Sequence, residues 1–195
     1  MKKSLGAKTL GCPTPLWVIG TYDSEGKPNV MTIAWGGICC SKPPSVNISL
    51  RKDRYSYDSI IKNKAFTINI PSEKYAKEAD YFGIATGSKR DKFADTGLTP
   101  VKSDLVDAPY IKEFPLILEC KMTHKTEIGI HILFVGEIID VKADESVLGE
   151  NGLPDINKVQ PVLFAPVVRT YHGIGNTLGK AFSMGKAFSM GKDIK

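Results

Sequence analysis

Asn29-Val30-Met31-Thr32-Ile33-Ala34-Trp35-Gly36-Gly37 has the pattern of a strand that ends on an indole and two glycines. The glycines would let another backbone or a flat ligand approach closely. A second segment, Ser45 to Tyr57, begins as a strand and ends in the cations and hydroxyls of Arg51-Lys52-Asp53-Arg54-Tyr55-Ser56-Tyr57. Such a transition from strand to helix favours anions, because free N–H groups and guanidinium groups both attract a phosphate. A flat surface beside an anion clamp indicates a mononucleotide cofactor, with a flavin as the leading candidate.

Period-two alternation dominates the rest of the chain. Leu16 to Thr21 leads through a turn-like segment into Asn29 to Ile33, so these two runs are expected to form a hairpin. The other strands are expected at Val46 to Leu50, Phe66 to Ile70, Leu116 to Met122, His131 to Val141 and Val162 to Phe164. In Phe66 to Ile70 the residues Phe66, Ile68 and Ile70 should share one face. The pattern predicts about seven strands.

Helices are expected to be few and short. They are predicted from a Ser56 cap to about Lys62, from a Ser72 cap through Glu73 to Phe82 before Gly83, and from Asp91 to Asp95 before Gly97. A parallel sheet would need a helix between most strands, and the gaps here are too short for that. The prediction is a mainly β fold, an antiparallel β-barrel with a few short peripheral helices.

Length and charge set the outer limits. A chain of 195 residues is expected to form one domain. The formal net charge of +5 comes from 26 basic and 21 acidic residues that are interspersed along the chain. This pattern favours an anionic small molecule over a phosphate backbone, although a lysine-rich surface explains most of the charge. A basic nucleic-acid-binding barrel is an alternative class, and the interleaved acidic residues count against it.

The cysteines and the N-terminus bear on the compartment. No apolar stretch of signal-peptide length follows Met1, and no segment has the apolar length of a membrane helix, so a cytoplasmic protein without a membrane partner is expected. The four cysteines, Cys12, Cys39, Cys40 and Cys120, contain no C-x-x-C motif. Reduced, structural thiols are the favoured interpretation, with a redox role for Cys39 or Cys40 beside a flavin as the alternative.

Several other chemistries lack their motifs. The three histidines, His124, His131 and His172, form no H-E-x-x-H, and no Cys/His spacing supports a metal site. Neither G-x-G-x-x-G after a strand nor G-x-S-x-G is present, so a Rossmann site and a hydrolase elbow are unsupported. NAD(P)H as an electron donor stays open, because it needs no separate domain if it stacks directly on a flavin.

The order of several motifs resembles a known family. These motifs are Pro13-Thr14-Pro15-Leu16-Trp17-Val18-Ile19-Gly20-Thr21, Pro28 to Gly37, Lys42-Pro43-Pro44, Ser49-Leu50-Arg51 and Lys89-Arg90-Asp91-Lys92-Phe93. From about Cys12 to Tyr171 the chain resembles the flavin reductase-like FMN-binding split β-barrels, and most of all their flavoredoxin branch. The resemblance implies a Greek-key type barrel and a homodimer that holds FMN in a groove between its subunits.

The resemblance also implies roles for the first strands. The strand from Asn29 to Trp35 would lie along the isoalloxazine, with backbone groups of Met31, Thr32 and Ala34 at its polar edge and the side chains of Asn29 and Trp35 reaching it. Without the resemblance, a core indole is the better interpretation of Trp35.

On the phosphate and ribityl side the resemblance places Ser49, Arg51 and Ser56. For Arg51 the alternative is a surface ion pair with Asp53, which is the commonest fate of such an arginine.

Three more positions follow from the resemblance. Lys92 falls in a basic loop whose cation reaches the phosphate, although Lys89 or Arg90 could serve instead. His131 matches a position that faces the flavin, and its alternative is a solvated histidine at a strand start. Phe164 matches an aromatic that can shield the ring, and its alternative is core packing.

The C-terminus carries the only internal repeat. Gly179-Lys180-Ala181-Phe182-Ser183-Met184 recurs as Gly185-Lys186-Ala187-Phe188-Ser189-Met190. Two copies of six residues cannot make a solenoid. We therefore assign residues 1–178 to one flavin-binding domain and expect residues 179–195 to be a mobile tail, with coverage of a partner subunit as the alternative.

The functional expectation is an FMN-containing, flavoredoxin-like protein that passes electrons from a reduced donor to a protein or small-molecule acceptor. The flavin would supply the chemistry, so no side chain need act as a catalytic residue. The alternative is an NAD(P)H-dependent flavin or ferric reductase of the same fold.

Overall fold

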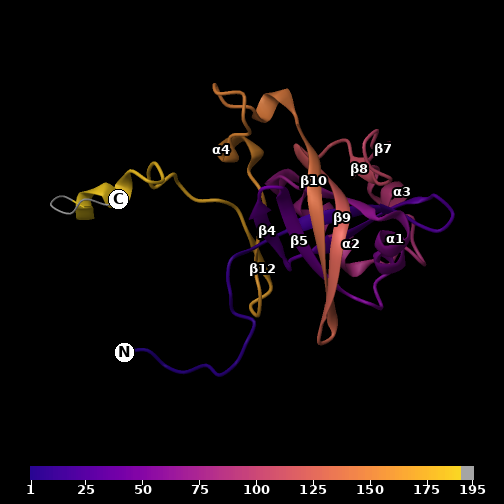
Figure 1. Cartoon of the computed structure of the whole chain (residues 1–195), viewed down its shortest axis with the longest axis horizontal. Coiled ribbons are helices and arrows are strands. Elements are labelled where there is room, and N and C mark those ends of the chain that lie inside the picture. Colours follow the sequence, from indigo (N-terminus) through magenta and orange to yellow (C-terminus); the bar gives the residue numbers. More distant parts are fainter. Residues whose placement is uncertain (190–195) are drawn as a thin grey trace.

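The fold is built on one antiparallel sheet. The computed structural model describes residues 1–189 (Figure 1). Its main sheet has seven strands in the order β3-β2-β6-β9-β10-β5-β4, and every ladder in it is antiparallel. The strands are β2 (Trp17–Tyr22), β3 (Pro28–Ile33), β4 (Gly36–Ser41), β5 (Pro44–Arg51), β6 (Ala65–Ile70), β9 (Leu116–Ile128) and β10 (His131–Ala143). The prediction of a mainly β, antiparallel fold is confirmed.

The sheet curls into a barrel because β5 returns to the end of β3. The backbone N–H of Ser49 donates to the Trp35 carbonyl at 2.8 Å and so joins the two sides. Inside lies a cluster of buried apolar residues from six strands and α1 (Ser56–Asn63). Its largest fully buried members are Phe66, Phe134, Ile19, Ile48, Ile60, Ile68 and Ile132.

The predicted hairpin is confirmed, since Trp17 of β2 pairs with Ile33 of β3 and Tyr22 pairs with Pro28. The predicted face of β6 is confirmed too: Phe66 and Ile68 belong to the interior cluster and Ile70 packs against it. The strand β4 was missed, because its two glycines were interpreted only as a point of close approach. It pairs with β5 and forms an edge of the sheet.

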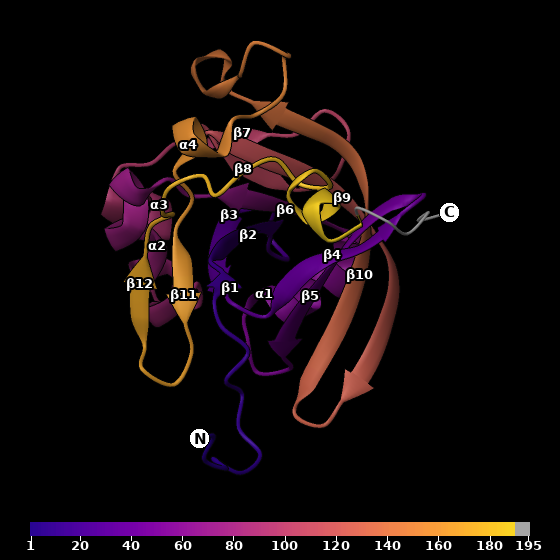
Figure 2. The same cartoon turned by 90° about the vertical axis from the view of Figure 1, so that its left-hand side faces the viewer.

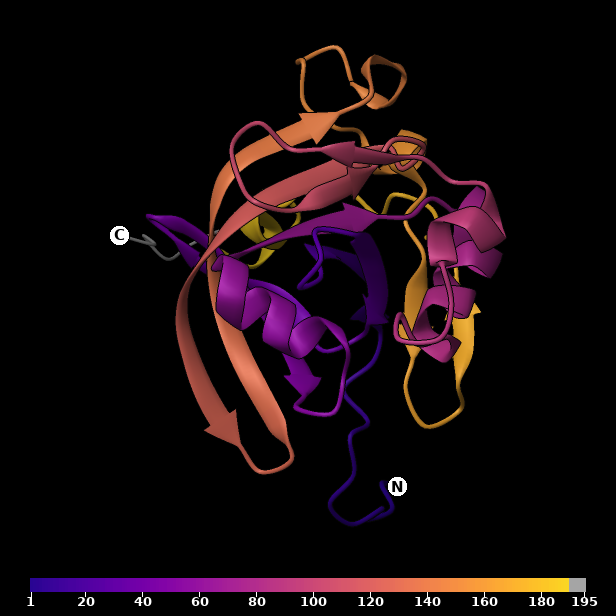
Figure 3. The same ribbon diagram turned by 90° about the vertical axis from the view of Figure 1, so that its right-hand side faces the viewer.

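Smaller elements complete the chain. Two further sheets are formed by β1 (Thr14–Pro15), β11 (Leu163–Ala165) and β12 (Thr170–His172), and by β7 (Pro100–Lys102) and β8 (Pro109–Ile111). The remaining helices are α2 (Ala76–Ile84), α3 (Lys92–Thr96), α4 (Ile156–Val159) and the 3-10 segments Glu73–Tyr75, Glu145–Val147 and Met184–Ser189. The β11–β12 pair lies beside α2, and the β9–β10 hairpin extends past the barrel (Figures 2 and 3).

Two of the predicted helix boundaries are wrong. Ser56 begins α1 but does not cap it, because its side chain is buried and engaged with Asn29. The helix expected after Ser72 is divided into a 3-10 turn and α2, and Gly83 lies inside α2 instead of ending it. The third helix is confirmed: Asp91 accepts from the Ala94 N–H at 3.1 Å, and Gly97 ends α3 with φ of 70°.

All four cysteines, which lie within residues 1–189, are free. Cys120 is buried, and burial raises the pKa of its thiol to about 12, so it behaves as a structural apolar residue. Cys12, Cys39 and Cys40 are exposed, so the structural interpretation does not hold for them. A register irregularity in β4 between Ile38 and Cys40 accompanies the exposure of both neighbouring thiols.

The C-terminal repeat is described only in part. Leu178 and Phe182 are exposed. The chain that follows β12 runs away from the barrel (Figure 1). The second copy of the repeat runs to Met190, which lies outside the described residues. The mobility of the tail therefore stays a prediction, as does the domain boundary at residue 178. Among the helices of residues 1–189, none combines the length and the apolar character that a membrane crossing requires.

Candidate cofactor site

Two adjoining hollows lie along β3. The first, here called the lysine hollow, has a volume of about 140 Å³ and lies between β3, the start of α1 and the loop that follows α2. It is lined by Asn29, Met31, Thr32, Asp53, Arg54, Tyr55, Ser56, Phe82, Gly83, Ile84, Ala85, Thr86, Gly87 and Lys92. The second, the tryptophan hollow, has a volume of about 190 Å³. It is lined by Met31, Thr32, Ile33, Ala34, Trp35, Ser49, Leu50, Arg51, Arg54 and His131.

The hollows form one groove, because Met31, Thr32 and Arg54 line both of them. The groove gathers all the predicted site residues except Phe164. Asn29, Ser56 and Lys92 lie in the lysine hollow, and Ala34, Trp35, Ser49, Arg51 and His131 lie in the tryptophan hollow. Phe164 lies in β11, where its ring packs on Tyr171 with centroids 5.6 Å apart.

The floor of the lysine hollow is fixed by a buried polar pair. Asn29 Nδ2 donates to Ser56 Oγ at 3.0 Å, and both side chains are almost fully buried. This bond ties the start of β3 to the first turn of α1. Because buried polar groups need partners, the pair explains why a serine stands at the helix start without capping it.

Lys92 is a buried cation at the hollow's wall. Its ammonium donates to the carbonyls of Val30 at 2.7 Å and Phe82 at 3.0 Å. An ammonium has three donors, so one is left for a ligand. Burial, together with the nearby charge of Arg54, lowers the pKa of Lys92 to about 8. Among the described residues, no carboxylate pairs with Lys92, so its charge lacks a local counter-ion.

The structure distinguishes Lys92 from its basic neighbours. Arg90 is turned toward Asp95, with bonds of 2.7 and 2.9 Å, and the Asp95 carboxylate holds the pKa of Arg90 above its ordinary value. Lys92, in contrast, lines the hollow. Of the three candidates in the basic loop, Lys92 lines the groove, whereas Lys89 and Arg90 are not among its lining residues.

Two arginines have different positions in the groove. Arg51 lines the tryptophan hollow and forms an ion pair with Asp53 at 2.6 Å, the surface pairing that was the alternative for it. Arg54 lines both hollows, and its closest carboxylate contact, to Asp53, is 3.8 Å long. Sequence reasoning noted Arg54 in the cationic run but did not assign it. The signal available in the sequence was its position two residues before the start of α1.

The tryptophan hollow is bounded by residues from β3, β5 and β10. Trp35 is half-buried, whereas the indole that packs against the barrel core belongs to Trp17. His131 is also half-buried and stands opposite Arg51 in the ladder between β10 and β5. The histidine is therefore part of the groove's wall and not only a solvated strand end.

Sequence reasoning missed the opposite wall of the lysine hollow. It is formed by Tyr55 and by residues 84–87, which run from the last residue of α2 into the loop that follows. Gly87 fits there because an added Cβ would overlap Asn29 Oδ1 and Tyr55 Cδ1. This close approach of backbone to side chains is what glycine permits and a larger residue would block.

The two ends of the groove have different chemistry. The lysine hollow combines Lys92, Arg54, the hydroxyl of Thr86 and the first turn of α1, which together suit a phosphate. The tryptophan hollow has one wall of β3 backbone with an indole and an imidazole, which suits a flat ring with polar edges.

Comparison with known proteins identifies the family. The chain matches the flavin reductase like domain over residues 9–173, and it belongs to that family. Flavoredoxin of Desulfovibrio vulgaris (Miyazaki F) is 58% identical, with a TM-score of 0.92 over 95% of this chain and 100% of that one. Flavoredoxin from Methanosarcina acetivorans is 30% identical, with a TM-score of 0.86 over 96% and 98% of the two chains. The predicted flavin reductase-like split β-barrel is thus confirmed.

A relative with a named activity is more distant. The reductase component of 4-nitrophenol 4-monooxygenase/4-nitrocatechol 2-monooxygenase from Rhodococcus opacus is 30% identical over 125 residues, which are 64% of each chain. The chain is accordingly flavoredoxin-like within a flavin-binding family.

Proposed function

We propose that this protein binds FMN in the groove along β3 and transfers electrons through it. The observation that supports this most is that two cations, Arg54 and the buried Lys92, line one small hollow that continues into the tryptophan hollow. The FMN phosphate would occupy the lysine hollow, and the isoalloxazine would lie against β3 with Trp35 and His131 beside it. The family and the flavoredoxin relatives support the flavin, and the cationic end of the groove supports the mononucleotide.

The protein's own residues would hold and orient the cofactor. The bound flavin supplies the electron-transfer chemistry. Lys92 and Arg54 would neutralise the phosphate, while Ser49 and Ser56 offer hydroxyls along the groove. Backbone groups of residues 31–34 and the imidazole of His131 would supply hydrogen bonds to the polar edge of the ring.

A homodimer is part of the proposal. Trp35 and His131, which line the tryptophan hollow, are each only half-buried in the single chain. A ring bound there would keep a side open to solvent, and a second copy would cover it. Sedimentation of the FMN-loaded protein should show a dimer. A monomer that still binds FMN tightly would contradict this part of the proposal.

The donor and acceptor decide between two functions. We favour a flavoredoxin-like electron carrier, because the flavoredoxin of Desulfovibrio vulgaris is similar over nearly the whole chain. An NAD(P)H-dependent flavin or ferric reductase is the alternative, and the named reductase component of Rhodococcus opacus supports it. Stopped-flow mixing of the FMN-loaded protein with NADH and NADPH separates them. An electron carrier should be reduced slowly by both, whereas rapid bleaching of the flavin would favour the reductase.

FMN affinity should depend on pH through Lys92. The pKa of Lys92, about 8, means that its ammonium is charged below that pH and loses its proton above it. A bound phosphate favours the charged form, so the pKa of Lys92 should be higher in the FMN complex than in the apoprotein. Between these two pKa values, beginning at about pH 8, the affinity for FMN should fall by up to about tenfold for each pH unit. Titrations of apoprotein at several pH values measure this.

Riboflavin is the control for this pH dependence, because it has no phosphate. Its affinity should not follow the ionisation of Lys92, and Lys92→Met should remove the slope for FMN. Equal pH slopes for the two flavins would contradict the role of Lys92.

A further inference from the structure

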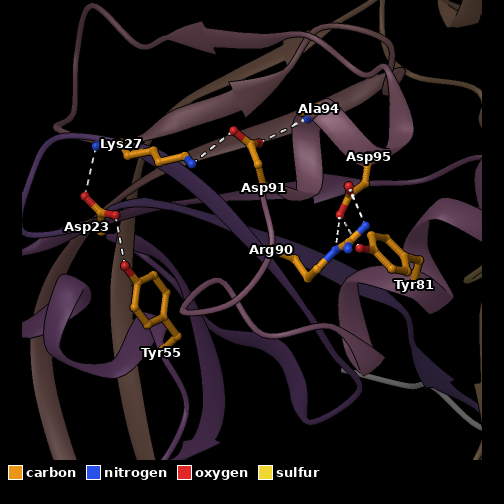
Figure 4. Close-up of polar contacts among 8 residues, drawn as sticks. All are labelled: Asp23, Lys27, Tyr55, Tyr81, Arg90, Asp91, Ala94 and Asp95. Carbon is orange, nitrogen blue, oxygen red and sulfur yellow. Dashed lines mark hydrogen bonds and ion pairs between the residues drawn. The ribbon is translucent and has the colours of Figure 1, made fainter.

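Tyr55 forms a rim at the end of the lysine hollow. It follows β5 and precedes α1, and 37% of its surface is exposed. Its hydroxyl donates to Asp23 Oδ2 at 2.9 Å (Figure 4). Asp23 is itself fixed in the β2–β3 turn, because its Oδ1 accepts the backbone N–H groups of Glu25 and Lys27, each at 2.9 Å. The tyrosine ring is therefore tied to a rigid turn.

The same turn holds the opposite wall. The ammonium of Lys27 lies 3.0 Å from Asp91 Oδ2, and Asp91 caps α3 at the end of the loop that lines the hollow (Figure 4). At Gly87 that loop packs so closely on Tyr55 that an added Cβ would overlap the ring. Both walls thus meet at the Tyr55–Gly87 contact, and one turn ties them together.

Beyond Tyr55 lies a third hollow, here called the rim hollow, of about 360 Å³. It is lined by Asp23, Ser24, Lys52, Asp53, Arg54, Tyr55, Asp58, Ser59 and Lys62. Asp53, Arg54 and Tyr55 line both this hollow and the lysine hollow. The Tyr55 ring therefore stands between two polar spaces.

We propose that Tyr55, positioned by Asp23, is the residue that selects a flavin mononucleotide against a flavin adenine dinucleotide. The inference rests on the proposed function. FMN ends at its phosphate, which the lysine hollow would accommodate. FAD continues into a second phosphate and an adenosine, which need space beyond the first phosphate, and the ring of Tyr55 occupies that space. Specificity would then come from a steric block against the larger ligand more than from extra attraction to the smaller one.

The test compares FMN and FAD affinities by calorimetry on the full-length apoprotein and its variants. Tyr55→Ala joins the lysine and rim hollows, and Asp23→Ala releases the ring from its anchor. Tyr171→Ala is a matched control: Tyr171 is 38% exposed and its hydroxyl donates to an aspartate, Asp80, at 2.6 Å, but it stands on β12. Circular dichroism verifies that each variant folds.

Wild type should bind FMN more tightly than FAD. Tyr55→Ala should lower the ratio of FMN to FAD affinity by about tenfold or more, and Asp23→Ala should lower it by a smaller factor. Tyr171→Ala should leave the ratio unchanged. If Tyr55→Ala does not fold, the ratio in Asp23→Ala decides.

The outcomes separate this inference from the proposed function. An unchanged ratio in folded Tyr55→Ala, with wild type binding FMN, would overturn the role of Tyr55 and leave the function standing. Wild type that binds neither flavin would overturn the function itself.

Discussion

Arg54→Ala is expected to weaken FMN binding by about 1.5–3 kcal/mol, roughly ten- to a hundredfold, because it removes a charge-assisted contact to the phosphate. Arg54 lines both hollows, and its contact to Asp53 is long at 3.8 Å, so its guanidinium is available to a ligand. Riboflavin has no phosphate, and its affinity should change little. Both flavins are titrated into wild-type and variant apoprotein, and the quenching of flavin fluorescence gives the loss of affinity for each flavin.

Arg51→Ala is the matched control for this prediction. Arg51 lies in the tryptophan hollow, outside the lysine hollow proposed for the phosphate, and it already pairs with Asp53 at 2.6 Å. Loss of an exposed arginine in such a pair should cost at most about 1 kcal/mol of binding free energy for either flavin. Its replacement should therefore affect FMN and riboflavin about equally. If Arg54→Ala weakens both flavins to the same extent, Arg54 does not contact the phosphate.

Lys142→Met is expected to lower the free energy of unfolding by about 2–3 kcal/mol, because it leaves a buried carboxylate without its counter-ion. Glu119 is fully buried, and its Oε2 lies 2.9 Å from the Lys142 ammonium in an ion pair. Asp140 and Glu119 together hold the pKa of Lys142 above its ordinary value. The loss of unfolding free energy should be smaller than for a fully buried ion pair, because 35% of the lysine side chain is exposed. Urea denaturation at neutral pH measures it.

Glu119→Gln supplies the control for the ion pair. In the Glu119→Gln background, Lys142→Met should lower the free energy of unfolding much less, because no buried charge remains to be neutralised. A double-mutant cycle of the two substitutions isolates the energy of the ion pair. Additive losses would show that Lys142 stabilises the fold by packing its methylene stem and not by its charge.

Much of the groove could be predicted from the sequence because it lies on one strand. Met31, Thr32, Ala34 and Trp35 are consecutive or nearly so, and their alternation already indicates which of them share a face. The β2–β3 hairpin that presents them follows from local turn chemistry. Positions fixed by neighbours in sequence are the ones that a pattern predicts well.

The rest of the groove depends on contacts between distant segments. Which of Arg51 and Arg54 faces the lysine hollow is set by the path of the chain between β5 and α1, and the residue pattern leaves both open. The loop at Gly87 reaches the groove only through its packing on Tyr55 and Asn29. Ser56 has the composition of a helix cap, but the tertiary bond to Asn29 overrides that local preference.

The identity and amount of flavin bound by the purified protein directly test the main proposal, namely that this protein binds FMN. We expect FMN at about one molecule per chain, taken up by apoprotein in preference to FAD, because the cationic lysine hollow suits a terminal phosphate. Denaturation of the loaded protein followed by chromatography of the released flavin measures both quantities. FAD at full occupancy, or an apoprotein that takes up no flavin, would contradict the proposal.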